Sequence, residues 1–327
     1  MPVSFVSDQQ KQGYGVYLGD PSPEQLARFF FLDDTDIEVI SKCRGDHNRL
    51  GFALLLCSAR FLGTFPAEVS TVPSSVTTYV SRQLHISSPK TRLAEYENTD
   101  ERSYRRHTSE ISSLYGFTEF TDYSAQFRIM RWLYGLCWTG TDRPSTLFDR
   151  ATDWLLSHKV LLPGISVLER LIARTRKHAQ ERVWRLLSSE LTEIQKRSLD
   201  SLLLIEEGKT KTLLDVLRHG PKRRSARELA RALDRLERIR GLGITLAIPK
   251  RLPRSKLQEL SRFATTAKCA AIERLPEARK YATLAAFIDT VEASATDDVL
   301  DLFDVVMRHG DSEAVTRCNT MPQSLAR

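Results

Sequence analysis

Residues 222–238 have the sequence KRRSARELARALDRLER, and this stretch gives the clearest indication of a helical fold and of a basic surface. Ser225 and Glu228 have the spacing of a capping box, which predicts that a helix begins at this point. Apolar residues then recur at the spacing of one buried helical face, at Ala226, Leu229, Leu233 and Leu236. The stretch therefore predicts an amphipathic helix anchored in a larger domain.

A second face of the same helix carries arginines. They recur at i, i+4, i+8 and i+11, at Arg227, Arg231, Arg235 and Arg238. A helix with one core face and one arginine face can offer cations to phosphates. The alternative is an ordinary solvated face, because Asp234 and Glu237 lie close enough to pair locally with the arginines.

The distribution of charge favours the first interpretation. Residues 165–260 contain 23 Lys and Arg against 12 Asp and Glu, whereas the whole chain contains 48 against 41. The rest of the chain is therefore slightly acidic, and the positive charge is concentrated in one segment. Such an asymmetry predicts a polyanionic partner, most often nucleic acid.

Length and periodicity predict an all-α, multi-domain protein. A chain of 327 residues with 41% hydrophobic residues is long enough for two or three packed cores. Helical patterns dominate, and they are interrupted near Gly140 and Pro144. We expect a first helical DNA-binding domain at 1–140, a second at 145–245, a linker with helical pieces at 246–307 and a divergent, disordered tail at 308–327.

Several classes of protein are disfavoured by what the sequence lacks. The five cysteines are far apart and form no C-x-x-C pair, which is typical of free thiols in a reducing cytoplasm. No signal peptide and no apolar run of about 20 residues is present, so we expect neither secretion nor a membrane span. No phosphate-binding loop, dinucleotide fingerprint or metal-ligand spacing occurs. We therefore expect no catalytic residue, no metal ligand and no cofactor in this chain.

Two stretches have the outline of a helix-turn-helix unit. In the first, a helix through Leu147 and Leu155 is followed by a connector at 158–164 and a second helix that opens with a Ser166–Glu169 capping box. The exposed positions of that second helix are basic: Arg170, Arg174, Arg176 and Lys177. The outline returns at 210–218 and in the helix that follows Ser225. An ordinary helical hairpin has the same outline, so this alternative stays open.

Two further basic clusters lie in the first domain. The segment 45–51 is a loop-to-helix junction in which Asp46 or Asn48 can cap the helix, and the backbone amides, His47 and Arg49 can meet a phosphate. A charged helix further on carries Arg105 and Arg106. The alternatives are a purely structural cap at the junction and a solvated helix face.

Other segments resemble a known family. The chain has Pro23-Glu24-Gln25-Leu26-Ala27-Arg28-Phe29-Phe30, then Arg44-Gly45-Asp46-His47-Asn48-Arg49-Leu50-Gly51, and later Leu161-Leu162-Pro163-Gly164. These segments and the run from Asp297 to Asp304 resemble, in the same order, the N-terminal part of transposases of the Tn-three family. The resemblance covers about residues 1–307.

The resemblance implies a replicative DNA transposase from bacteria. In that family the N-terminal region binds the terminal inverted repeats of the transposon through successive helical domains. A ribonuclease-H-like domain with an Asp-Asp-Glu triad that binds magnesium follows it, and nothing in this sequence resembles that domain. We expect the chain to bind double-stranded DNA and, by itself, not to cut it.

The residues expected at the DNA come from all four basic segments. They are Arg170, Arg174, Arg176, Lys177, Arg223, Arg224, Arg227 and Arg231, with His47, Asn48, Arg49, Arg105 and Arg106 as secondary candidates. Most should contact phosphates and only one or two should contact base edges. Two alternatives remain open, a subunit completed by a separate catalytic part and a regulatory fragment that pairs with intact transposase.

Overall fold

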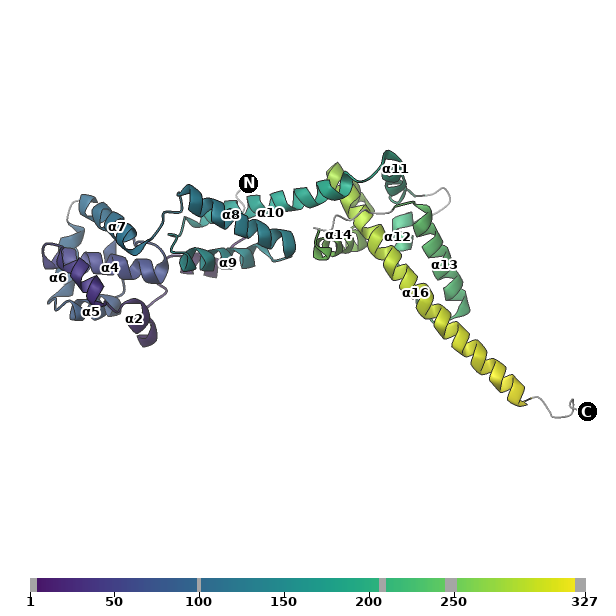
Figure 1. The fold of residues 1–327 in the computed structure, drawn as a ribbon, viewed down its shortest axis with the longest axis horizontal. Coiled ribbons are helices and arrows are strands. Elements are labelled where there is room, and N and C mark those ends of the chain that lie inside the picture. The colour runs from purple at the N-terminus through teal and green to yellow at the C-terminus, as the bar shows by residue number, and fades with distance from the viewer. Residues whose placement is uncertain (1–4, 99–100, 206–209, 245–251, 321–327) are drawn as a thin grey trace, which may run out of the picture. The chain divides into compact units, whose positions relative to one another are not determined.

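The structure is a computed structural model that describes residues 5–98, 101–205, 210–244 and 252–320, with side chains as far as residue 308. The described residues form sixteen α-helices and one short 3₁₀ helix, with two isolated β-bridges and no strand (Figure 1). The predicted all-α fold is confirmed. None of the described helices is long and apolar enough to cross a membrane.

The chain divides into two compact units. The first contains residues 1–136 and 142–176, and the second contains residues 137–141 and 177–327. The main division between these units falls inside α10 (Ile165–Ser188), and the domains expected at 1–140, 145–245 and 246–307 stay a prediction. The first half of α10 buries Leu168 and Ile172, and its second half buries Val183 and Leu187 in another cluster. A continuous helix carries no loop signal, so no sequence pattern marks this division.

Nine helices and the start of α10 build the first unit. They are α1 (Asp8–Gly13), α2 (Pro23–Phe29), α3 (Asp34–Ser41), α4 (Asp46–Leu62), α5 (Ser74–Gln83), α6 (Pro89–Glu97), α7 (Glu101–Tyr115), α8 (Tyr123–Thr139) and α9 (Pro144–Ser157). The 3₁₀ helix η1 (Val69–Thr71) precedes α5. Helix α2 begins where Ser22 and Gln25 cap each other and Pro23 occupies the first turn.

Helix α4 is the centre of the core of the first unit. Every residue from Leu50 to Ala59 is buried, and α2, α3, α5, α6 and α7 pack around it. Apolar residues on all sides of a helix require neighbours on all sides, which is why the shorter helices surround α4. An ion pair between buried Asp36 and half-buried Arg60 stabilises this arrangement: Arg60 donates to both carboxylate oxygens of Asp36 at 2.7 and 2.8 Å, and Tyr115 donates to the same group at 2.8 Å.

The second unit is organised along one long helix. Its elements are the end of α10, α11 (Glu193–Ser201), α12 (Leu213–Leu217), α13 (Ala226–Gly241), α14 (Arg254–Thr266), α15 (Cys269–Glu273) and α16 (Glu277–Thr320). Helices α13 and α14 lie along α16, which buries Leu284, Phe287 and Ile288 (Figure 1). A smaller cluster joins the end of α10 to α14 and α16.

The C-terminal helix differs from the prediction. The sequence predicts a linker with helical pieces at 246–307 and a disordered tail from 308, whereas the structure has one helix from Glu277 as far as Thr320. Asp297 and Asp298 lie inside α16, where Asp298 pairs with Arg235 at 3.0 Å. Residues 321–327 of the expected tail lie outside the described residues.

Candidate nucleic-acid interface

Unpaired cations gather where α13 begins. Ser225 accepts a hydrogen bond from the amide of Glu228 at 3.3 Å, so the predicted cap is present. Glu228 does not complete the box, because its carboxylate accepts from the amide of Lys222 instead and pairs with Arg231. The side chains of Arg223, Arg224 and Arg227 are exposed and make no ion pair within the described part of the chain.

The rest of the predicted arginine face is already occupied. Arg235 is 11% exposed, donates to the carbonyl of Leu217 at 2.9 Å and pairs with Asp298. Arg238 pairs with Asp234 at 3.0 Å, and this is the local pairing that the sequence left open. The arginine face is therefore free only over the first turn of α13.

The core face of α13 is also rotated from the prediction. Ala232, Leu236 and Ile239 are the buried residues, whereas Leu233 is 49% exposed and Ala226 is exposed. Helix α13 packs beside α16, and the face that contacts the core is the one that carries Leu236 and Ile239. The same rotation carries Arg235 toward α16 and leaves Arg227 outside.

A basic groove borders the first turns of α13. It has a volume of about 350 Å³ and is lined by the loop 219–222 and by Arg231, Arg235 and Arg238. Glu228 and Asp234 also line it, so part of the positive charge is balanced within the groove. The backbone amides at the N-terminus of α13 add a partial positive charge beside the groove, and this charge favours binding of an anion.

The basic residues of α10 lie on its exposed side, with one exception. Arg170 and Arg174 are exposed, Arg176 is half-buried, and Lys177 pairs loosely with Glu181 at 3.7 Å. The Nε of Arg170 donates to the carbonyl of Ser166 at 3.0 Å, which leaves its other N–H groups free for a ligand. Arg170 and Arg174 are therefore the accessible cations of α10 in the first unit.

Glu169 has a different role from the one predicted. We expected it to form a capping box with Ser166, but it is 6% exposed and accepts the amides of Phe5 and Val6 at 3.0 and 3.2 Å. The connector before α10 is also fixed in place, because Leu161 and Leu162 donate to Thr118 and Gly63. These contacts hold the start of α10 rigidly, whereas the helix-turn-helix assignment stays a prediction.

The two secondary clusters of the first unit converge. Burial raises the pKa of the Cys43 thiol and Glu110 raises it further, whereas Arg106 on α7 and Arg49 at the start of α4 both lie close enough to lower it in part. Arg106 is exposed, and Arg105 pairs with Glu101 at 2.8 Å on the surface. Segments far apart in sequence thus meet near Cys43, where the acidic Glu110 lies with the two arginines.

The turn that begins α4 is held mainly by its own side chains. The N-cap is Gly45, at φ +82°, and neither Asp46 nor Asn48 caps the helix, so this part of the prediction is wrong. Asn48 donates instead to the carbonyl of Arg44 at 2.8 Å. His47 lies 3.9 Å from Glu95, and Arg49 pairs with Asp46 at 3.3 Å. These contacts favour the structural alternative for His47, Asn48 and Arg49.

Some exposed basic residues were not predicted. Arg44 is exposed beside Gly45, and α8 exposes Arg128 and Arg131 next to Phe127. Neither arginine of α8 was among the residues expected at the DNA. The buried residues of α8, Ala125, Ile129 and Leu133, define the opposite face, and that spacing was the signal that could have placed the two arginines outside.

A family model described as "Domain of unknown function (DUF4158)" matches residues 5–175. The chain belongs to this family. It is 41% identical over 307 residues to the transposase for transposon gamma-delta from Escherichia coli (strain K12), a match that covers 94% of this chain and 30% of that protein. It is 29% identical over 305 residues to the transposase for transposon Tn1546 from Enterococcus faecium, with 92% and 30% covered.

A third relative has the same relation to this chain. The transposase for transposon Tn501 from Pseudomonas aeruginosa is 28% identical over 311 residues, which are 94% of this chain and 30% of that protein. The predicted resemblance to Tn-three family transposases is confirmed. The chain spans about 30% of the length of these relatives. No group of three or more His, Cys, Asp or Glu side chains that could hold a metal ion occurs among the described residues.

Proposed function

We propose that this chain binds double-stranded DNA at the terminal inverted repeats of a transposon. The observation that carries the proposal is the group of unpaired cations, Arg223, Arg224 and Arg227, at the start of α13. Phosphates are favoured at such a place, because arginine donors and the positive end of a helix act together there. The names of the relatives add independent support, since each is a transposase.

Each unit supplies its own basic surface. In the second unit it is the start of α13 with Lys222, and in the first it is Arg170 and Arg174 on α10 and, separately, Arg106 on α7. Arginine and lysine contacts of this kind bind phosphates of any sequence and set the position of the protein on the duplex. In this proposal these residues supply most of the affinity for DNA. A smaller number of contacts with base edges recognises the repeat sequence.

The test is a binding titration with two duplexes, one that carries the terminal repeat and one with the same bases scrambled. The wild-type chain should bind the repeat more tightly. The variant Arg223→Ala/Arg224→Ala/Arg227→Ala should lose about tenfold or more in affinity for both duplexes, because it loses phosphate contacts.

A matched control removes three exposed cations from another part of the same unit. Arg262, Lys268 and Arg274 are exposed on and beside α14 and α15, and their replacement by alanine changes the net charge equally. The control variant should bind nearly as the wild type does. Equal loss in both variants would mean that only net charge matters, and the proposed surface would then be wrong.

A further inference from the structure

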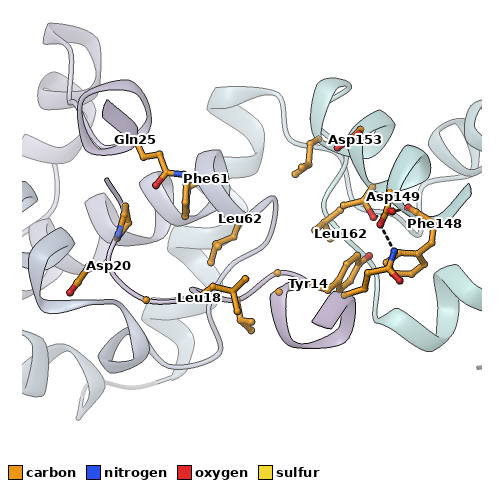
Figure 2. Close-up of a pocket in the computed structure, with 18 residues that line it drawn as sticks. Tyr14, Leu18, Asp20, Gln25, Phe61, Leu62, Phe148, Asp149, Asp153 and Leu162 are labelled. Carbon is orange, nitrogen blue, oxygen red and sulfur yellow. Dashed lines mark hydrogen bonds between the residues drawn. The ribbon is translucent and has the colours of Figure 1, made fainter. Parts of the chain in front are cut away.

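A pocket of about 530 Å³ lies in the first unit, away from the residues proposed for DNA (Figure 2). Its walls are the loop 13–21, the end of α4 with Phe61 and Leu62, and the face of α9 that carries Phe148, Asp149 and Asp153. Figure 2 shows the two carboxylates on one side and Phe61 and Leu62 on the other. Apolar walls with a few polar groups are typical of ligand sites.

The charge of this pocket is opposite to that of the chain. Among its eighteen lining residues are Asp20, Asp149 and Asp153, and none is Lys, Arg or His. Asp149 accepts a hydrogen bond from Gln10, and Asp20 accepts one from Ser75, but neither makes an ion pair within the described part of the chain. The chain as a whole has a net charge of +7.

The walls of the pocket are held in place before any ligand arrives. Gly15 and Gly19 adopt φ values of +68° and +106°, which side chains with a Cβ disfavour, and so the loop can turn sharply here. The hydroxyl of Tyr17 hydrogen-bonds with that of Ser58 on α4 at 2.8 Å. The rings of Tyr14 and Phe148 pack with centroids 5.2 Å apart and form one aromatic wall.

We propose that this pocket binds an arginine or lysine side chain, with its apolar neighbours, from a protein partner. The apolar stem of such a side chain fits Leu18, Phe61 and Leu156, and its cation meets Asp149 and Asp153. A guanidinium also stacks well on an aromatic wall. DNA is a poor occupant, because three carboxylates repel phosphates.

The probe is the peptide N-acetyl-leucyl-arginine amide, and its matched control has citrulline, which has nearly the same shape without the charge. Both are titrated into the full chain with labelled leucine methyl groups, and the signals of Leu18, Leu156 and Leu162 are followed. The arginine peptide should shift these signals in a saturable way. The citrulline peptide should bind at least about tenfold more weakly, because it lacks the charge that the carboxylates attract.

Variants locate the interaction. Asp149→Asn and Asp153→Asn should each weaken binding of the arginine peptide about fivefold, which is the upper end of what one exposed charge pair contributes. Asp34→Asn, a change of the same kind on α3 outside the pocket, should have no effect. If a pocket variant fails to fold, the comparison of the two peptides on the wild-type chain still decides.

Three results would overturn the proposal: equal binding of the two peptides, unchanged binding to both pocket variants, or displacement of the peptide by duplex DNA. The last result would place the pocket on the DNA surface. Binding to DNA can fail without affecting the peptide result, since the two sites share no residue. The two proposals are therefore tested separately.

Discussion

The ring of Tyr96 on α6 lies directly against Gly51 on α4, so that a Cβ at position 51 would overlap the ring. Tyr96 is 5% exposed, and its hydroxyl hydrogen-bonds with Nδ1 of His107 on α7 at 3.0 Å. This close approach joins the central helix of the first unit to two neighbours. It also explains why a glycine stands in the middle of a helix, where it otherwise costs stability.

The first prediction concerns that contact. Gly51→Ala should lower the free energy of unfolding by about 1–3 kcal/mol, because the added methyl group forces Tyr96 away. Gly135→Ala on α8 should raise it by up to about 1 kcal/mol, since that glycine is exposed and has no atom near its Cβ position. Urea unfolding of both variants measures the two effects. A loss of stability in both would show that the space around Gly51 is not the cause.

The second prediction concerns the ion pair between Asp36 and Arg60. Burial alone would raise the pKa of Asp36, but hydrogen bonds from Arg60 and Tyr115 outweigh it and hold the pKa below its usual range. Asp36→Asn should lower the free energy of unfolding by about 2–3 kcal/mol at neutral pH, because it leaves half-buried Arg60 without a charged partner.

The same lowered pKa sets the pH dependence. A carboxyl whose pKa is lowered by folding contributes stability above its unfolded pKa of about 3.9, and the contribution is lost as pH falls below that value. The difference in stability between wild type and Asp36→Asn should therefore be constant above about pH 5 and shrink toward pH 3. A difference that stays constant down to pH 3 would contradict the role given to this carboxylate.

The third prediction concerns His107. Burial between Phe52 and Tyr96 lowers its pKa to about 4, and the nearby Arg106 contributes to the shift. Folding therefore favours the neutral ring, which gives full stability above the unfolded pKa of about 6.5 and loses it as pH falls toward 4. His107→Gln should remove about 3 kcal/mol from the change in stability between pH 7 and pH 4. Unfolding curves at several pH values measure this, and an unchanged profile would show that His107 does not titrate in this range.

The fourth prediction separates a structural arginine from those assigned to DNA. Arg235→Ala should lower the free energy of unfolding by about 3 kcal/mol, because it leaves Asp298 and the carbonyl of Leu217 without their partner in a partly buried place. Arg227→Ala should leave stability nearly unchanged and weaken binding to DNA. Thermal unfolding and DNA titration of both variants compare them, and the reverse pattern would refute the assignment.

Much of the fold could be predicted from local patterns. The helix starts at Ser22 and Ser225 follow from hydrogen bonds within four residues, and the sequence contains both partners. The apolar run from Leu50 to Leu56 indicates a segment that is buried on all sides, as this part of α4 is.

The errors come from contacts between distant residues. Glu169 could not be assigned to the amides of Phe5 and Val6, because nothing in the sequence shows that these segments meet. The orientation of α13 depends on α16, and the pairing of Arg235 with Asp298 spans 63 residues. Arg49 and Arg106 both lie near Cys43, and this could not be predicted because they come from segments far apart in sequence.

The most direct test of the account is the salt dependence of DNA binding. Affinity for the terminal-repeat duplex is measured between about 50 and about 200 mM salt for the wild type, for Arg223→Ala/Arg224→Ala/Arg227→Ala and for the matched control at Arg262, Lys268 and Arg274. If six cations contact phosphates, the wild type should show a log–log slope near −5, and the first variant a slope smaller by about 2.7, since each phosphate contact contributes about 0.9. The control should keep the wild-type slope. A wild-type slope near zero, or the same slope in all three proteins, would contradict the claim that these arginines bind the DNA backbone.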